Sequence, residues 1–303
     1  MPPIMGAAAF IMAEFTGVPY LQVAAAAAIP AILYYESCIL QVHFHAAKRG
    51  LGGLPKDQLP SASKAFREHF NQLFPVCILV VAMCIGYSAF RSALIAMLSV
   101  PFCSLLRKNT RMNWRDIVRA LISGAKTSVL VCVACATSGI VIGCISMTGL
   151  AVRLTTLITN IGSAALLPAL ILTMLATIVL GMGIPTSAAY ITCVAVTAPI
   201  LTKLGISTFQ AHFFVFYYAV LSSITPPVAI AAYAASGIAK ADPLKIGFHA
   251  CRLGIIAFVV PFMFAYAPAL LLIGEPAEIA LAAVTSIAGT AVLAAGIEGY
   301  LTR

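Results

Sequence analysis

The segment 180–190, LGMGIPTSAAY, holds the residues whose types and spacing best suit the binding of a small ion. Three residues that interrupt helices follow one another closely there: Gly181, Gly183 and Pro185. They lie in the uncharged run 154–202, where a single crossing would pass the membrane centre. Carbonyl groups freed by the break can coordinate a cation, and the helix N-terminus that begins at Thr186 and Ser187 suits an anion. A kinked span that its neighbours tolerate is the alternative.

A second break is expected in the segment 221–229, LSSITPPVA. Three hydroxyl side chains precede a double proline there: Ser222, Ser223 and Thr225, followed by Pro226 and Pro227. Neutral oxygen ligands without a carboxylate suit a monovalent cation such as Na⁺ better than a divalent one. A purely structural turn is the alternative. The two segments together predict a Na⁺ site, and its expected ligands are Gly181, Thr186, Ser222 and Thr225.

The whole chain is far too apolar for a soluble fold. Of its 303 residues, 62% are hydrophobic and only 9% are charged, whereas a soluble domain has about 25% charged residues. The apolar runs are continuous rather than alternating, which argues against a β-barrel and predicts an all-α polytopic membrane protein. The chain has no P-loop, GxSxG elbow or HExxH motif, so we expect neither an enzyme nor a bound cofactor.

The charges orient the expected helices. The net charge of +9 comes from 18 basic and 9 acidic residues. No basic patch carries interleaved aromatic residues, so we attribute the excess to cytoplasmic loops rather than to nucleic-acid binding. Segment 113–121 is expected to be a helix in the membrane interface or else a solvated linker. The predicted topology puts Arg91 and Arg153 outside and Lys56, Lys108, Lys203 and Lys240 inside.

Uncharged runs mark the candidate spans. They cover residues 15–35, 70–90, 92–106, 127–152, 154–202, 204–239, 253–273 and 279–297. The run 204–239 is too long for one span and too short for two, and both of its basic flanks belong inside. We therefore predict a re-entrant hairpin with legs 209–225 and 227–239. Its tip is fixed by two prolines that cannot donate a backbone hydrogen bond.

A weak internal repeat supports this topology. Five residues near the N-terminus recur at one fixed offset: Pro2, Pro3, Ala7, Ala8 and Pro19 match Pro226, Pro227, Ala231, Ala232 and Pro243. The two copies have opposite predicted orientations, and inverted repeats with broken helices near the midplane are typical of secondary transporters. The first copy begins at its double proline, so we expect this chain to be the C-terminal part of a longer protein.

These features divide the chain into three expected parts. Residues 1–106 form a partial first repeat, with the second leg of its hairpin and the helices that follow. Residues 107–274 form the second, inverted repeat, with the interfacial helix, a broken helix around 181–186, the re-entrant hairpin 209–239 and a final helix. Residues 275–303 form an extra C-terminal transmembrane helix.

Three segments of the chain resemble a known family. MPPIMGAAAFIMAEFTGVPY, GMGIPTSAAYI and AHFFVFYYAVLSSITPPVAIAAYAASGIAKADP are similar to the large membrane subunit of TRAP (tripartite ATP-independent periplasmic) transporters. The similarity is greatest to the fused permeases of the TAXI-type branch, and it extends from Met1 to about Gly274. By position, 181–186 match the second broken helix, 222–227 the second hairpin tip, and Pro2 and Pro3 the first hairpin tip.

The resemblance implies a fold and a function. The fold would be an elevator-type transporter in a bacterial or archaeal cytoplasmic (inner) membrane. The function would be import of organic acids, often carboxylates, driven by a Na⁺ gradient. A periplasmic binding protein would deliver the organic anion, and a small membrane subunit or a fused upstream segment would brace the scaffold. The alternatives are an ion-coupled carboxylate symporter without a binding protein, a passive pore built from re-entrant half-helices, and a non-transporting scaffold subunit.

The topology can be tested by labelling single cysteines in a version that has no other cysteine. In intact cells, Arg91→Cys should react with a membrane-impermeant thiol reagent, because we place it outside. Lys240→Cys should react only after the membrane is permeabilised. Labelling of Lys240→Cys exclusively from the outside would contradict the hairpin.

Overall fold

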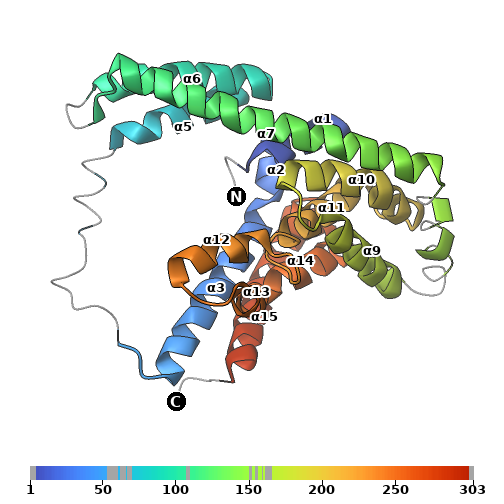
Figure 1. Ribbon diagram of the computed structural model, residues 1–303. Coiled ribbons are helices and arrows are strands. Elements are labelled where there is room, and N and C mark those ends of the chain that lie inside the picture. The colour runs from blue at the N-terminus through green and yellow to red at the C-terminus, as the bar shows by residue number, and fades with distance from the viewer. Residues whose placement is uncertain are drawn as a thin grey trace.

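The computed structural model describes residues 5–52, 61, 66, 70–106, 110–149, 152–153, 156–158, 160 and 166–299, and the regular secondary structure in these ranges is entirely helical. Figure 1 shows the helices, which are α1 (Ala7–Thr16), α2 (Tyr20–Ala26), α3 (Ala28–Lys48), η2 (Phe70–Leu73), α5 (Phe74–Cys84), α6 (Ala89–Leu105), α7 (Trp114–Met147), α9 (Leu166–Gly181), α10 (Thr186–Lys203), α11 (Thr208–Leu221), α12 (Ile230–Ala239), α13 (Pro243–Leu253), α14 (Ile255–Tyr266), η4 (Pro268–Leu271) and α15 (Pro276–Glu298). The predicted all-α class is therefore confirmed.

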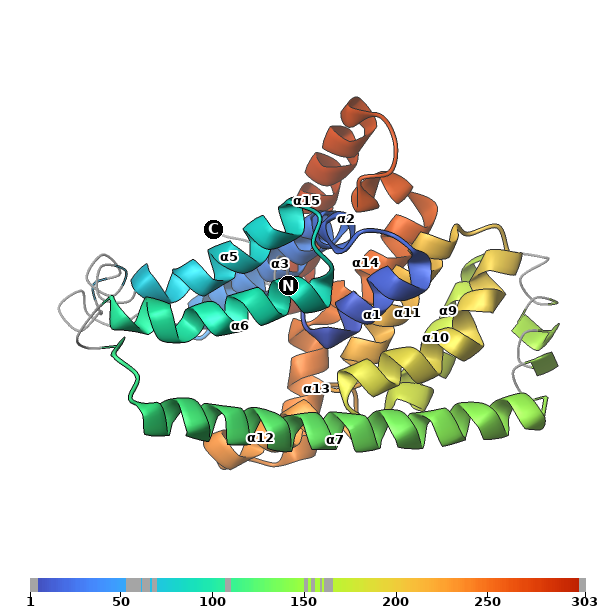
Figure 2. The same ribbon diagram turned by 90° about the horizontal axis from the view of Figure 1, so that it is seen from above.

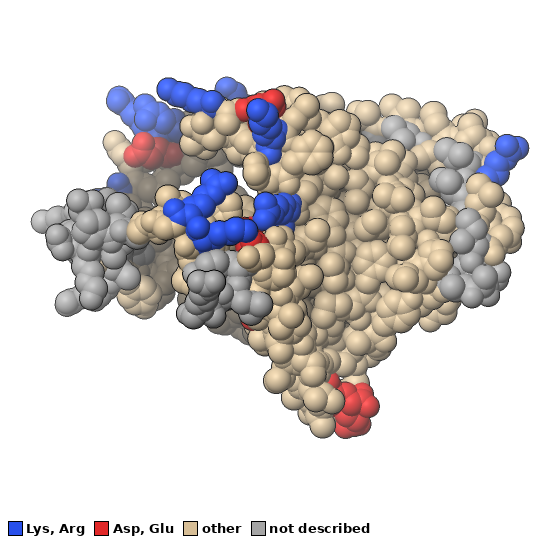
Figure 3. All heavy atoms as spheres, turned by 90° about the horizontal axis from the view of Figure 1, so that it is seen from below, with Lys and Arg blue, Asp and Glu red and all other residues tan. Residues whose placement is uncertain are grey.

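The helices suit a membrane. By length and composition, two stretches of the described residues can cross one, Tyr20–Lys48 and Pro276–Glu298. The pair Pro243–Leu253 and Ile255–Tyr266, bent by 42°, adds a third if it is one broken span. Figure 3 shows a broad surface without Lys, Arg, Asp or Glu, while most of the charged side chains gather toward one end. Large apolar side chains are exposed along many helices, as lipid contact requires.

The core forms where α9, α10, α11 and α14 meet α1. Its largest fully buried side chains are aromatic: Tyr190, Tyr218, Phe213, Phe214 and Phe264. Helix α1, from the start of the chain, packs against α10 and α11, as Figure 2 also shows. Segments from the two ends of the sequence therefore build one core.

The first uncharged run, 15–35, is not one helix. Helix α1 ends at Thr16, and Gly17 takes a left-handed conformation with φ 67°. Pro19 then lies at the N-cap of α2 with an extended backbone, and a proline here cannot continue the preceding helix. Helix α3 begins at Ala28, continues past Glu36, where the uncharged run ends, and stops at Lys48.

Segment 113–121 is helical from Trp114, as the first of its two predicted alternatives requires, and it is not a linker. Its place in the membrane interface stays a prediction. The segment forms the start of α7, which continues without a break for 34 residues, or about 51 Å. The amide of Asn113 donates to the Asp116 carboxylate (3.0 Å), which helps to start the helix. The sequence has no proline between Trp114 and Met147 to stop it. Figures 1 and 2 show α7 running along one side of the molecule, past α10.

The run 70–90 also divides earlier than expected. Helix α5 ends at Cys84, and α6 begins at Ala89 after a short turn. The Ser88 side chain caps α6 by accepting from the amide of Arg91 (3.4 Å). Arg91 therefore stands in the first turn of α6, where its guanidinium lies 4.8 Å from the centre of the Tyr87 ring.

A buried carboxylate ties the last helix to the rest of the chain. Glu298, at the end of α15, has a side chain only 2% exposed. Its Oε2 lies 3.1 Å from Nδ1 of His45 on α3 and 3.2 Å from a guanidinium nitrogen of Arg252 on α13. Lys48 Nζ donates to the backbone carbonyl of Glu298 (2.7 Å). A carboxylate at this depth requires such partners, so the C-terminal end of α15 is fixed to α3 and α13.

Removing this carboxylate should loosen α15. We expect Glu298→Gln to lower the thermal unfolding midpoint in detergent, with a loss of about 1–3 kcal/mol in the free energy of unfolding, because the side chains of His45 and Arg252 are partly exposed. Glu275→Gln, at the exposed N-terminal end of the same helix, is the matched control and should unfold at the temperature of the unsubstituted protein. Equal midpoints for the two variants would contradict the role of Glu298.

Candidate functional site

The helix break predicted around 181–186 is present. Helix α9 ends at Gly181 and α10 begins at Thr186. Between them Gly183 has φ 81°, a backbone conformation that favours glycine. Pro185 is the N-cap of α10, with an extended backbone and no N–H to donate. The two glycines and the proline therefore interrupt the helix, as their residue types predicted.

The second predicted break is also present, with different limits. Helix α11 ends at Leu221 and α12 begins at Ile230, so both legs are shorter than the predicted 209–225 and 227–239. Backbone hydrogen bonds hold the tip in a compact turn, and one of them runs from the amide of Ala231 to the carbonyl of Ser223 (2.9 Å). The longer tip follows from the double proline, which stops α11 early and delays α12.

The two legs do not lie along each other as in a closed hairpin. Helix α12 has α13 as its main neighbour, whereas α11 packs against α9, α10 and α14. Figure 1 shows α12 beside α13. A Cβ atom built on buried Gly247 of α13 would lie 3.2 Å from Cγ of Pro226, so α13 holds the tip closely. The re-entrant path through a membrane stays a prediction.

The structure brings the two breaks into contact. The buried Ser222 hydroxyl at the tip lies 3.0 Å from the carbonyl oxygen of Gly181 and 2.8 Å from that of Ala219, so it can donate to either. A Cβ atom on Gly181 would lie only 2.8 Å from Ser222 Oγ, so the close approach requires glycine there. Val228 Cγ1 lies 3.6 Å from the Cβ position of Gly183. The two clusters found separately in the sequence thus form one junction.

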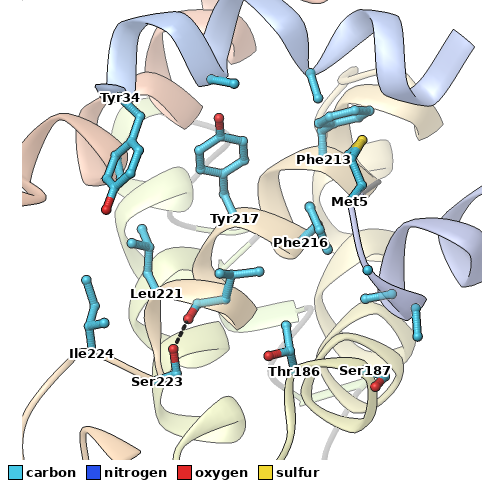
Figure 4. Close-up of a pocket in the computed structure, with 17 residues that line it drawn as sticks. Met5, Tyr34, Thr186, Ser187, Phe213, Phe216, Tyr217, Leu221, Ser223 and Ile224 are labelled. Atoms are coloured by element: carbon cyan, nitrogen blue, oxygen red, sulfur yellow. Dashed lines mark hydrogen bonds between the residues drawn. The ribbon is translucent and has the colours of Figure 1, made fainter. Parts of the chain in front are cut away.

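A cavity of about 510 Å³ adjoins this junction. Six parts of the chain line it: the start of α1 with the segment that leads into it, α3, the N-terminus of α10, the inner face of α11, the tip and α14. Figure 4 shows the hydroxyls of Thr186, Ser187 and Ser223 toward one side of it and the rings of Phe213, Tyr217 and Tyr34 toward the other. Phe216 lies between them. This is a cavity of the size that small ligands occupy.

The predicted Na⁺ ligands are only partly gathered. Gly181 and Ser222 are joined by a hydrogen bond. Thr186 is exposed and lines the cavity. The Thr225 hydroxyl donates to Leu221 O within its own turn (2.7 Å). In the described part of the chain, no hydrogen bond connects Thr186 or Thr225 to the Gly181–Ser222 pair, so the four-ligand site stays a prediction.

Two predicted residues cannot be placed, and several others were missed. Pro2 and Pro3 lie outside the described residues, although Met5 and Gly6 just after them line the cavity. The aromatic lining was not foreseen, and the run FFVFYY at 213–218 was its only signal in the sequence. A buried pair was missed too, in which the Tyr190 hydroxyl lies 2.7 Å from His212 Nδ1.

This geometry defines a helical membrane protein in which a broken helix meets a second helix break beside a ligand-sized cavity, as in secondary transporters. The family model of the DctM component of tripartite ATP-independent periplasmic transporters matches residues 1–279. The chain therefore belongs to this family, and it is the large permease subunit of such a transporter. The resemblance seen in the sequence is confirmed, while its TAXI-type branch stays a prediction. No curated protein matches the chain. Nearly all of α15 lies beyond the family match.

The close approach of Gly181 and Ser222 can be tested by adding and then removing bulk. Gly181→Ala should lower the thermal midpoint, because its Cβ would meet Ser222 Oγ at 2.8 Å and Ser222 Cβ at 3.2 Å. Adding Ser222→Gly removes both atoms and should restore much of the loss. Gly289→Ala, whose Cβ would meet nothing within 4 Å, is the control and should be neutral or stabilising. A failure of Ser222→Gly to rescue would show that the two breaks do not depend on each other.

Proposed function

We propose that this permease subunit imports organic acids, mainly carboxylates, by coupling their entry to a Na⁺ gradient. A periplasmic binding protein would deliver the substrate, and a small membrane subunit or a fused upstream segment would complete the membrane part. The transporter would reside in a bacterial or archaeal cytoplasmic membrane and cross it several times. One observation carries the proposal: the broken helix and the hairpin tip touch through Ser222 and Gly181 beside a cavity.

The junction has the chemistry of a Na⁺ site. Its oxygens are neutral, from the carbonyl of Gly181 and the hydroxyl of Ser222, and the hydroxyl keeps lone pairs after it donates. No Asp or Glu is among the described residues that line the adjoining cavity. Neutral oxygens at a helix break support a monovalent rather than a divalent ion. Because the hydroxyl has two possible acceptors, it could turn toward Ala219 when an ion takes the carbonyl of Gly181.

The cavity offers a place for an anion. The N-cap of α10 is Pro185, whose side chain makes no capping hydrogen bond, so the first amides of α10 are open to a ligand. They carry the positive end of the helix dipole. The hydroxyls of Thr186 and Ser187 lie beside them. Helix α1 also begins at this cavity, and its N-cap Gly6 provides no side-chain cap either.

Coupling would follow because one short turn joins the proposed ion site to the proposed anion site. The turn that runs from Gly181 to Thr186 ends α9 at the ion site and starts α10 at the anion site. An ion that fixes this turn would also fix the amides that hold the anion, so each ligand would favour the other. We further propose an elevator-type movement, in which the block of α1, α9, α10 and α11 moves against α3 and α15.

The test is Na⁺-driven uptake by the complete transporter in proteoliposomes, with its binding protein. Ser222→Ala should raise the Na⁺ concentration for half-maximal uptake roughly 5- to 150-fold, because the loss of one oxygen ligand costs about 1–3 kcal/mol of binding free energy. Ser236→Ala on α12 removes a hydroxyl with a similar backbone bond, to Tyr233 O at 2.7 Å, away from the junction. It should leave the Na⁺ dependence unchanged.

Other outcomes would favour other functions. Uptake that needs no binding protein would support an independent symporter. Equal uptake without a Na⁺ gradient would count against coupling and favour a passive pore. An unchanged Na⁺ dependence in Ser222→Ala would indicate that the junction has only a structural role.

A further inference from the structure

We propose that the substrate of this cavity is a monocarboxylate with an apolar body, such as an aromatic ring, rather than a dicarboxylate or a polyhydroxy acid. This inference rests on the proposed function, because it assumes that the cavity beside Gly181 and Ser222 is the place where the transported acid binds. It goes further by naming the class of acid from the chemistry of the lining.

The described part of the lining has no side chain that could neutralise a charge. None of the described residues that line the cavity is Lys, Arg, His, Asp or Glu. A carboxylate must therefore be held by backbone amides, hydroxyls and a bound cation. Two of these are on one side of the cavity: the N-terminus of α10 and the hydroxyls of Thr186 and Ser187. The proposed ion site at Gly181 does not line the cavity, but it contacts the tip through Ser222, next to the lining residue Ser223. The cavity can thus stabilise one carboxylate at one side.

The opposite side favours an apolar group. The ring of Phe213 is fully buried, and Phe216 and Tyr217 are half-buried beside it. Ala27, Ala31 and Ala257 add small apolar surfaces and leave room between the helices. Phe216 is itself held by Tyr190, with the ring centres 5.7 Å apart in an edge-on arrangement. A flat or branched apolar body fits such a surface without needing a hydrogen-bond partner.

A second charge would have no oppositely charged partner among the described residues on this side. The polar groups there are the phenols of Tyr34 and Tyr217, which can donate a hydrogen bond but carry no positive charge. Burying an unpaired carboxylate against aromatic rings is strongly unfavourable. A chain of hydroxyl groups would lose its water and find only these two phenols in exchange. The cavity therefore selects against both kinds of acid.

Ligand binding to the complete permease without its binding protein tests this, because the binding protein has its own selectivity. The probes are phenylacetate, succinate and gluconate, each with and without Na⁺, and the measurement is the ligand-induced rise in thermal midpoint. We expect phenylacetate to raise the thermal midpoint at a concentration at least tenfold lower than succinate or gluconate does. Succinate or gluconate binding as tightly as phenylacetate would overturn the inference.

Variants locate the binding in the cavity. Phe216→Leu removes a ring but keeps an apolar side chain, and it should lower the affinity for phenylacetate at least fivefold. Ala31→Phe fills space on the α3 side and should weaken phenylacetate more than the smaller acetate. Phe102→Leu, at a residue of α6 that is 72% exposed, should change the affinity for neither phenylacetate nor acetate. Equal effects of Phe216→Leu and Phe102→Leu would overturn the assignment.

The results separate this inference from the proposed function. Na⁺-dependent binding of succinate in place of phenylacetate would support the coupled transporter and overturn the substrate class. Binding of phenylacetate that is lost in Ala31→Phe but does not depend on Na⁺ would support the substrate class and overturn the coupling. Binding of none of the probes would overturn the cavity as a carboxylate site.

Discussion

Backbone polar groups left without partners by a broken helix are the constraint on which this structure depends. In a membrane protein such groups must be satisfied by protein, water or a ligand. The carbonyl of Gly181 at the end of α9 finds the Ser222 hydroxyl at the end of α11. Each break therefore stabilises the other, and glycine at 181 is the only residue whose size permits the approach.

The site is assembled from segments that are far apart in the sequence. Met5 and Gly6 come from the start of the chain, Thr186 and Ser187 from the middle, and the tip from residues 222–229. They meet because α1 packs on α10 and α11 in one aromatic core. That core includes Tyr190, which bonds His212 and also supports Phe216. The packing that stabilises the fold is thus the same packing that shapes the cavity wall.

A second, electrostatic contact holds the other side of the molecule. Helix α15 lies along α3, and its end is fixed by Glu298 through His45, Lys48 and Arg252. Apolar side chains cannot align two helices in lipid by the hydrophobic effect alone, since lipid is equally apolar. A buried carboxylate with partners on two other helices supplies that alignment. Helix α15 lies almost wholly beyond the residues that match the family model. The contact through Glu298 therefore joins a helix outside the match to α3 and α13, which lie within it.

The sequence by itself determined the class of the protein and the position of its breaks. Composition required a membrane, and Gly181, Gly183, Pro185 and the double proline marked two interruptions, since their backbone limits are local. Helix ends were less certain: nothing local stopped α7 at Leu121, and Gly17 with Pro19 divided a run that looked continuous. Only the tertiary structure decided that Ser222 meets Gly181, that α12 packs on α13 and that aromatic rings line the cavity. Those facts depend on distances between segments remote in sequence, which hydropathy and residue spacing do not encode.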